Sequence, residues 1–396
     1  MLGEILVEQG LIDEKTLNSI LSVQRRKLEL SKTGIARETA VRSKLQGAKA
    51  TTYLQLAREL GASDLYLTSA QKPMVRVNGN LMELPAEALS FDECRDLLFS
   101  LLSPEQVKRY YVNKYLDFCM EVPAVGRFRT NIFRHFRGIG GIFRVILDDV
   151  WPFERLGLPG VVRRFVDLPR GLVLVTGPTG SGKSTTLASL LDLVNRTQQK
   201  HIITIEDPIE FIFESRQSMV SQRELYAHTP AFVSALRAAL REDPDIIVVG
   251  EMRDPETVAT AINAAGTGHL VFGTLHTLSA HRTVARILDQ FPSQKRAQVR
   301  ATLATVLKGV VCQQLVPNAD GKGRSLASEI MIMTPAIANL IREDRSWQIP
   351  MMIQMGRNQG MRLMDDSLTE LVRLKKITIE EAVSRAGEKD RFLSPA

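Results

Sequence analysis

The chain has 396 residues, of which 44% are hydrophobic and 24% charged, and this composition indicates a globular protein of two or three domains and excludes a disordered or fibrous one. Its 51 Lys and Arg residues against 44 Asp and Glu give a net charge of +7, which suits an acidic partner but equally an ordinary basic surface. Its 3 cysteines form no C-x-x-C pair, which argues against a zinc ribbon or a disulfide framework. No apolar run is long enough to span a bilayer, so we expect a cytoplasmic protein without a membrane span.

The first 50 residues predict a short helical extension followed by a linker. Residues 1–30 contain two amphipathic helical patterns, and Asp13 caps the second. Residues 31–50 are polar and basic with little periodicity, which is typical of a linker. The apolar positions of the second helical pattern are Leu17, Ile20 and Leu21.

Residues 51–155 predict a small α+β domain. Periodicity and turn signals place its helices at 51–60 and 91–102 and its strands at 64–68, 74–78, 126–133 and 141–146, with Asn78-Gly79 as a hairpin turn.

Arginines alternate with phenylalanines along the last two predicted strands of this domain. A strand pair with arginines outward and phenylalanines inward explains the alternation by itself. Arginines among aromatic rings could also bind single-stranded nucleic acid, or reach the γ-phosphate of a neighbouring subunit. The sequence leaves these three interpretations open.

Residues 156–396 predict helices that alternate with short apolar strands, regularly in the first part of this region. Strands are expected at 172–176, 202–205, 246–249 and 270–272, which predicts an α/β fold with a parallel sheet and helices on both faces. Beyond residue 300 we expect mostly helix, with a polar loop at 318–324.

A glycine-rich loop follows the first of these strands and precedes a helix. The pattern G-x-x-x-x-G-K-S in this context predicts a site for a nucleoside triphosphate, because backbone N–H groups and the helix N-terminus surround the phosphates. Lys183 is expected to reach the β- and γ-phosphates, and the Ser184 hydroxyl to ligate Mg²⁺. The loop and its first helical turn comprise Gly177, Pro178, Thr179, Gly180, Ser181, Gly182, Lys183, Ser184 and Thr185.

Carboxylates at the ends of two further strands are candidates for catalysis. Glu251 follows the strand at 246–249. The position before it, which usually supplies a carboxylate in nucleotide-hydrolysing enzymes, is Gly250, so Glu251 is the candidate base that activates water. Glu206, Asp207 and Glu210 end the strand at 202–205, and such a group would repel unless it met a cation. We therefore expect Glu206 and Glu210 near Mg²⁺ or the catalytic water.

Two histidines flank the strand at 270–272. His269 and His276 could bond a γ-phosphate or report its loss, or they could be buried core histidines. Zinc binding is not expected, because no cysteine or carboxylate is spaced to complete four ligands.

In order and spacing, these segments resemble the secretion-ATPase superfamily, and most closely its type IV pilus retraction branch. The resemblance rests on the phosphate loop, the acidic segment 204–211, the strand region 242–253 and the histidine segment 267–277. Segments 62–65, 126–129, 335–343 and 360–365 extend it across about residues 51–393. It implies a PAS-like domain, a RecA-like ATPase domain and a homohexamer with ATP between subunits.

The resemblance also implies roles and partners. Lys183 and Ser184 would hold the phosphates and Mg²⁺, Glu251 would activate water, Glu210 would support the metal, and both histidines would sense the γ-phosphate. The implied partner is the inner-membrane platform protein of the pilus, which would dock the motor at the inner face of the cytoplasmic membrane. Four arginines match ones that line the ATP site or act across the subunit interface: Arg129, Arg144, Arg237 and Arg241.

Three departures from the patterns of these ATPases bear on the task of the motor, and two of them keep alternatives open. The four-cysteine zinc motif of assembly ATPases is absent, which favours retraction. Gly266 replaces a common glutamate and Ala338 a common arginine, which leaves open an accessory subunit that hydrolyses weakly beside a second retraction ATPase. Residues 2–30 are extra for a retraction ATPase, and residues 2–11 resemble the opening of the N-terminal module of assembly ATPases, which leaves open fibre assembly, type II secretion or DNA uptake. Direct nucleic-acid binding is not expected.

Overall fold

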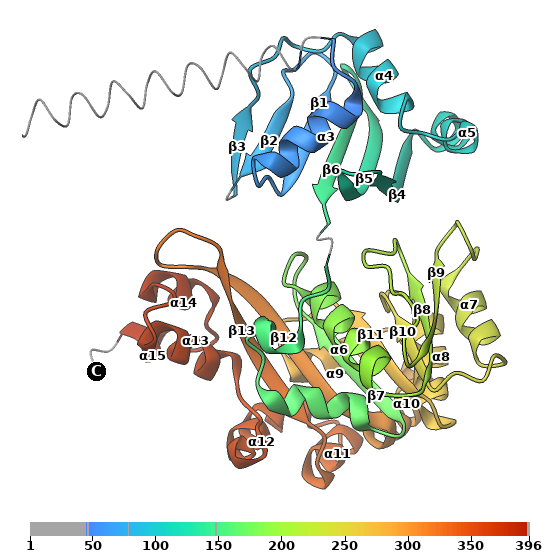
Figure 1. Cartoon of the computed structure of the whole chain (residues 1–396). Coiled ribbons are helices and arrows are strands. Elements are labelled where there is room, and N and C mark those ends of the chain that lie inside the picture. The colour runs from blue at the N-terminus through green and yellow to red at the C-terminus, as the bar shows by residue number, and fades with distance from the viewer. Residues whose placement is uncertain (1–44, 46, 78, 147–148, 394–396) are drawn as a thin grey trace, which may run out of the picture. The chain divides into compact units, whose positions relative to one another are not determined.

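The computed structural model describes residues 45, 47–77, 79–146 and 149–393 (Figure 1). The predicted extension at 1–30 and most of the predicted linker at 31–50 therefore lie outside the described residues. The described chain forms two compact units, one that ends at Val145 and one that begins at Ile146, whereas the sequence analysis put the boundary at residue 155.

The smaller unit is an antiparallel sheet with helices on one face. Its strand order is β3-β2-β1-β6-β5-β4, and every neighbouring pair is antiparallel. Residues of the three helices described in this unit share one hydrophobic core with one face of the sheet. The elements are α3 (Ala50–Glu59), β1 (Asp64–Thr68), β2 (Met74–Val77), β3 (Asn80–Glu83), α4 (Phe91–Phe99), α5 (Pro104–Asn113), β4 (Tyr115–Val122), β5 (Gly126–His135) and β6 (Gly138–Val145).

The predicted single helix at 91–102 was wrong in extent. The chain instead forms α4 and then α5, each started by a capping box, with Ser90 at the first N-cap and Ser103 at the second. The first helix ends at Phe99 with Ser100 as its C-cap, and Ser103, which avoids helical backbone because it precedes Pro104, starts α5 as its N-cap. Strands β3 and β4 were missed.

The larger unit is built on a seven-stranded sheet in the order β13-β12-β7-β11-β10-β8-β9. All neighbouring pairs are parallel except β12 and β13. This mixed, mostly parallel sheet confirms the predicted α/β fold class. Its strands are β7 (Gly171–Thr176), β8 (His201–Glu206), β9 (Met219–Glu224), β10 (Ile246–Val249), β11 (Leu270–Leu275), β12 (Leu307–Pro317) and β13 (Arg324–Ile332).

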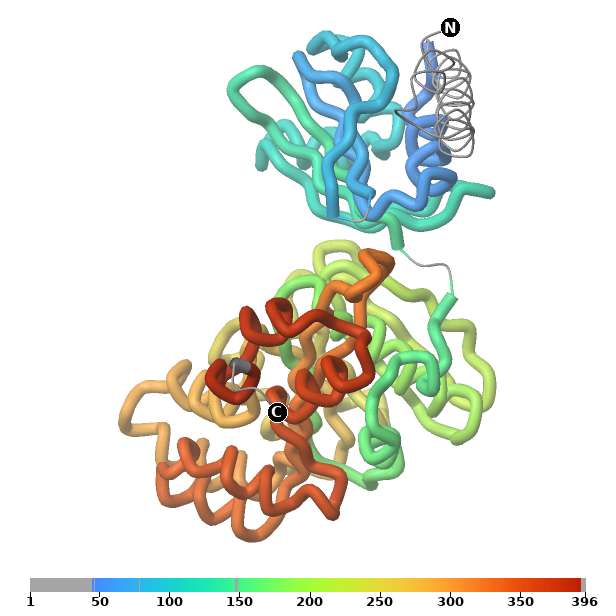
Figure 2. The backbone as a smooth tube through the Cα atoms, turned by 90° about the vertical axis from the view of Figure 1, so that its left-hand side faces the viewer, coloured from blue at the N-terminus to red at the C-terminus, as the bar shows by residue number. Residues whose placement is uncertain are grey.

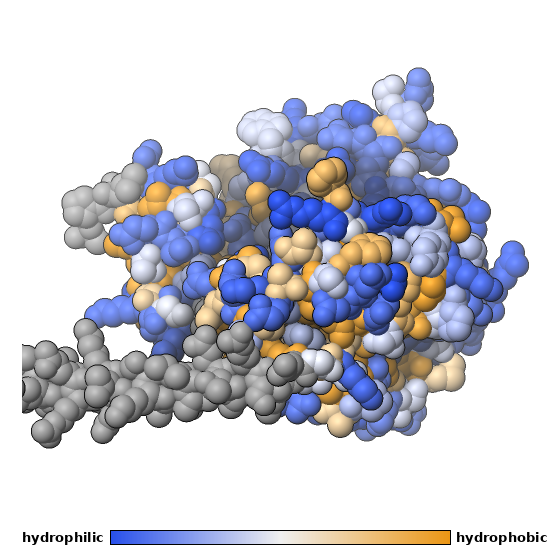
Figure 3. Space-filling model, turned by 90° about the horizontal axis from the view of Figure 1, so that it is seen from above, coloured by the Kyte–Doolittle hydropathy of each residue, from blue (hydrophilic) through white to orange (hydrophobic). Residues whose placement is uncertain are grey.

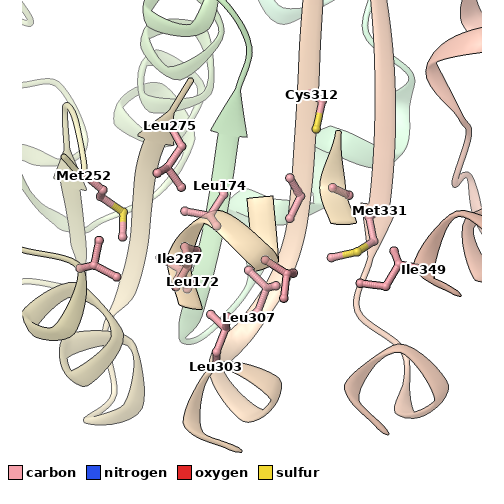
Figure 4. Packing of buried hydrophobic residues seen from close by; sticks show 14 of the residues in the cluster. Leu172, Leu174, Met252, Leu275, Ile287, Leu303, Leu307, Cys312, Met331 and Ile349 are labelled. Atoms are coloured by element: carbon pink, nitrogen blue, oxygen red, sulfur yellow. The ribbon is translucent and has the colours of Figure 1, made fainter. Parts of the chain in front are cut away.

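Helices cover both faces of this sheet. Alternate residues of β7 enter different cores. Leu172 and Leu174 pack on one face with helices that follow β9, and Val173 and Val175 pack on the other with the helix that follows β7 and the preceding 3₁₀ turns. Figure 4 shows Leu174, Leu275 and Leu307, from three strands of the sheet, among the buried side chains of the first of these cores. The helices on these faces are α6 (Lys183–Thr197), α7 (Phe232–Ala239), α8 (Pro255–Gly266), α9 (Ala280–Asp289) and α10 (Ser293–Val306), and the 3₁₀ turns are Phe153–Leu156 and Gly160–Asp167.

The expectation of a mostly helical chain beyond residue 300 was wrong in part. β12 and β13 form a long antiparallel hairpin, and β12 pairs in parallel with β7. The apolar run Val310-Val311-Cys312 is fully buried and is too short to be assigned to helix or strand by periodicity alone. The polar loop predicted at 318–324 is the turn of this hairpin.

Helices after β13 pack beside the hairpin, as the orange and red part of Figure 2 shows. Among the described residues, no helix combines the length and the apolar character that a membrane crossing would need. The remaining elements are α11 (Pro335–Arg342), α12 (Ile349–Met355), α13 (Met364–Arg373), α14 (Ile379–Arg385) and α15 (Asp390–Leu393), with 3₁₀ turns at Ser346–Gln348 and Arg357–Gln359.

Candidate active site

The glycine-rich loop joins the buried strand β7 to α6. Gly177, Gly180 and Gly182 have φ values of 144°, 77° and 92°, in the left-handed region that favours glycine. A Cβ at Gly177 would lie 2.3 Å from the Gln313 carbonyl oxygen, so the loop packs directly against the backbone of β12 and has no room for a side chain there. Gly182 is the N-cap of α6 and supplies no side-chain cap, which leaves the positive helix end for an anion.

Lys183 is held at this loop by the loop's own carbonyls. Its Nζ donates to the oxygens of Gly177 at 2.8 Å and Pro178 at 3.1 Å. Burial lowers the pKa of Lys183, and the nearby carboxylates of Glu251 and Glu210 partly offset that effect. Two candidate carboxylates therefore lie within electrostatic range of the lysine. Ser184 is exposed and Thr185 half-buried.

Strand register brings the remaining candidates to the same edge of the sheet. Leu275 pairs with Thr176, so His276 follows its strand beside the phosphate loop. Val249 pairs with Ile205, so Gly250 lies beside Glu206. Because the carboxyl ends of parallel strands meet at one edge, residues far apart in sequence form one site there.

Glu251 is the centre of a small polar cluster at this edge. Its Oε1 lies 2.5 Å from Arg253 Nε and 3.0 Å from His276 Nε2. Burial by itself raises the pKa of Glu251, but the contacts with Arg253 and His276 outweigh it and hold the pKa below the ordinary value. The carboxylate is therefore ionised at neutral pH and its direction is fixed by two partners, as a base or a water-positioning group requires.

Gly250 is required by the close approach of β10 and β8. A Cβ there would lie 3.0 Å from the Ile205 carbonyl oxygen and 3.1 Å from Glu206 Cα, and Gly250 N already donates to Ile205 O at 2.8 Å. The position where a carboxylate is common therefore has no room for a side chain, which leaves Glu251 as the acidic group at the end of this strand.

Glu206 has a different environment from Glu251. Its Oε1 accepts from Thr204 Oγ1 at 2.6 Å and from Gln222 Nε2 at 3.2 Å. Burial raises the pKa of Glu206 to about 7, with the charge of Glu210 acting in the same direction and the two hydrogen bonds against it. Because burial disfavours its charged form, Glu206 is a weaker candidate for Mg²⁺ than Glu210, which lies near Lys183.

No group of three or more His, Cys, Asp or Glu side chains able to hold a metal ion occurs among the residues that the model describes. The donors present instead fit Mg²⁺, which keeps several waters and takes few protein ligands beside substrate phosphates. The Ser184 hydroxyl and the Glu210 carboxylate are hard oxygen donors of that kind.

The structure does not bring His269 to this edge. His269 precedes β11, its carbonyl accepts from Gly171 N, and its Nδ1 lies 3.0 Å from Ala264 O. A strand of six residues separates it from His276, about 20 Å at the usual rise. Within one chain the two histidines cannot contact the same phosphate.

The four candidate arginines lie in three places. Arg129 pairs with Asp117 at 3.0 Å and Arg144 with Asp64 at 2.9 Å, all on the smaller unit. On the larger unit, Arg237 pairs at 2.7 Å with Glu256, in the first turn of α8, just after the Glu251 segment. Arg241 is exposed beyond the end of α7.

Sequence reasoning missed two residues that shape the site. Arg253 was part of the matched strand region, but nothing in the sequence showed that it would pair with Glu251. Gln313, fully buried under the loop, donates from Nε2 to Thr186 Oγ1 at 2.7 Å. It was missed because β12 was expected to be helical.

Comparison with known proteins gives a consistent result. Residues 160–385 match the family model for type II/IV secretion system proteins. The chain is 48% identical over 342 residues to the type IV pilus retractation ATPase PilT of Pseudomonas aeruginosa, covering 86% of this chain and 99% of that protein. It is 48% identical over 314 residues to a twitching motility protein of Neisseria gonorrhoeae, covering 79% of this chain and 84% of that protein. A crystal structure of the pilus retraction motor PilT with bound ADP superposes with a TM-score of 0.79 at 44% identity, covering 87% of this chain and 98% of that one.

Proposed function

The chain belongs to the type II/IV secretion system protein family, and within this family of ATPases we propose that it is the motor that retracts a type IV pilus and drives twitching motility. The observation that carries the chemistry is the meeting of Lys183, Glu251 and His276 at one sheet edge beside the phosphate loop. The direction of the motor rests on the high identity to retraction proteins over most of both chains.

In this proposal the loop and α6 bind ATP. The N–H groups of the loop surround the phosphates, and Lys183 leaves the carbonyls of Gly177 and Pro178 to contact the β- and γ-phosphates. Ser184 and Glu210, with Glu206 behind them, would hold Mg²⁺, which would neutralise phosphate charge. Glu251 accepts the proton of the attacking water, and Arg253 and His276 keep its carboxylate pointed at that water.

The remaining candidates act between subunits. We propose a homohexamer in which Arg129 and Arg144 of one subunit, with Arg237 and Arg241 at the site's border, stabilise charge on the γ-phosphate bound by another. His269, at the opposite sheet edge, can contribute to a nucleotide only through another subunit. The proposed partner is the pilus platform protein, at the inner face of the cytoplasmic membrane.

The test is Glu251→Gln, which keeps the shape of the side chain and removes the base. ATP binding should be retained while turnover falls by about 10² to 10⁴-fold. In cells whose only copy carries this change, we expect more surface pili and no twitching. Few or no pili would mean that the motor assembles the fibre instead.

Two further variants make the result interpretable. Lys183→Ala should lose tight ATP binding, which separates a binding defect from a defect in turnover. Glu154→Gln changes an exposed carboxylate 3.9 Å from its nearest cation, Arg163, and should leave turnover unchanged. Negligible ATP turnover by the wild-type protein alone would indicate an accessory subunit that depends on a second ATPase.

A further inference from the structure

A groove of about 1070 Å³ lies on the smaller unit where the described chain begins. It is bounded by residues that precede α3, by the first turn of α3, by the loop before α4 and by one side of α4. Leu45, the first described residue, lines this groove and is buried. The described chain therefore begins in the groove itself.

The groove has an apolar floor and an acidic rim. Leu89, Leu97 and Leu101 contribute apolar surface. Three carboxylates line it, Glu87, Glu93 and Asp96, with one lysine, Lys49, and all four are exposed. Asp96 also pairs with Arg95 at 2.9 Å. Figure 3 shows hydrophobic and hydrophilic residues close together on the face seen from above. An occupant should therefore offer an apolar face bordered by positive charge.

Residues 13–30 have that chemistry. The sequence predicts a helix from Asp13 whose Leu17, Ile20 and Leu21 share one face. The same segment continues into Arg25-Arg26-Lys27, which places three positive charges directly after the apolar face. The proposed ATPase function gives this segment no role.

We propose that the groove binds residues 13–30 of the same chain as an amphipathic helix. The apolar face lies on the leucines of the groove, and the basic triplet faces Glu87 and Asp96. Residues 31–44 span up to about 50 Å when extended, whereas a unit of 100 residues has a radius of gyration of about 13 Å. The connection is long enough for the helix to fold back onto the groove.

Tethering favours the chain's own segment over a second copy. A short linker gives an effective concentration of about millimolar, far above the concentration of free protein in most assays. The contact needs no partner from outside and is independent of nucleotide, so its failure would leave the proposed ATPase function intact.

The first experiment measures hydrogen exchange of the full-length protein by mass spectrometry. Amides in residues 13–30 should exchange at least about tenfold more slowly than in a synthetic peptide of the same sequence. Glu87→Lys with Asp96→Lys should remove most of this protection, because two attractive charges at an exposed contact become repulsive. Exchange at the peptide's rate in the wild type, or protection unchanged in the double variant, would overturn the proposal.

Asp92→Lys is the matched control. Asp92 is an exposed carboxylate in the first turn of α4 that does not line the groove, so its reversal should leave the protection of residues 13–30 unchanged. Arg25→Glu with Arg26→Glu should restore protection in the groove double variant. Absence of this rescue, with all variants folded, would contradict the charge pairing.

The second experiment identifies which chain supplies the helix. Ile20→Cys with Leu97→Cys is cross-linked by a short bismaleimide after mixing ¹⁴N- and ¹⁵N-labelled protein. Cross-linked peptide pairs of a single isotope support binding within one chain. Pairs of mixed isotope would assign the groove to a second copy and overturn the proposal as stated.

Discussion

Substituting alanine for Gly250 tests whether close packing of β10 on β8 is what shapes the candidate active site at this edge of the sheet. A Cβ at this position would lie 3.0 Å from Ile205 O and 3.1 Å from Glu206 Cα. Both are backbone atoms of a central strand, fixed by pairing on both sides, so neither can rotate away as a side-chain end could. The strands must separate by a few tenths of an ångström.

The expected cost follows from that geometry. Overpacking of this kind costs about 1–3 kcal/mol, and each kcal/mol lowers the melting temperature of a domain of about 250 residues by about 2–4 °C. Because Glu206 and Glu251 flank the contact, ATP turnover should fall together with stability. The measurements are thermal unfolding by circular dichroism and steady-state ATPase activity.

Gly266→Ala is the matched comparison. Gly266 ends α8, and a Cβ there would meet only Val306 Cγ1, at 3.7 Å. The same substitution should therefore be neutral or raise stability by up to about 0.5–1 kcal/mol, because glycine is the poorer helix residue. If Gly250→Ala melted and turned over like the wild type, the argument that this contact requires glycine would be refuted.

Three further predictions concern stability and reactivity. Burial raises the pKa of Glu329 above its ordinary 4.5, so the folded state holds this proton where the unfolded state releases it, and wild-type stability falls as pH rises above about 4.5. The free energy of unfolding of Glu329→Gln in urea should therefore rise relative to that of the wild type over that range, and parallel pH profiles would contradict this. Asp254 caps α8 by accepting from two backbone N–H groups, so Asp254→Ala should cost about 1 kcal/mol while Asp254→Ser costs less, as measured by chemical unfolding. Of the 3 cysteines, only Cys119 is not buried, so a maleimide should label it first in the native protein, and mass mapping that finds another thiol labelled equally fast would refute this.

Much of the nucleotide site could be predicted from sequence because it is encoded in consecutive residues. A fully buried strand, the three glycines of the loop and a helix start lie within 171–185, and each depends on local backbone preference. The structure describes each of these elements within that stretch. The capping boxes at Ser90 and Ser103 are equally local, yet only the first helix start was recognised.

Elements that depend on distant pairing were harder to predict. The apolar run in β12 is compatible with either helix or strand, and it is a strand because it pairs with β7 and β13. β9 and β3 have half-buried or exposed residues throughout, so neither shows the alternation or apolar run that marks a strand. Their identity comes from a neighbour's hydrogen bonds.

The sequence by itself predicted a nucleotide site at residues 177–185, an α/β fold for the second half of the chain, and a strand that ends at Glu251. Only the tertiary structure decided that Glu251 pairs with Arg253 and His276, that Gly250 has no room for a side chain, and that His269 lies at the opposite edge. The physical reason is that a parallel sheet brings together strand ends that are separated in sequence by whole helices, and the register of their hydrogen bonds decides which side chains meet.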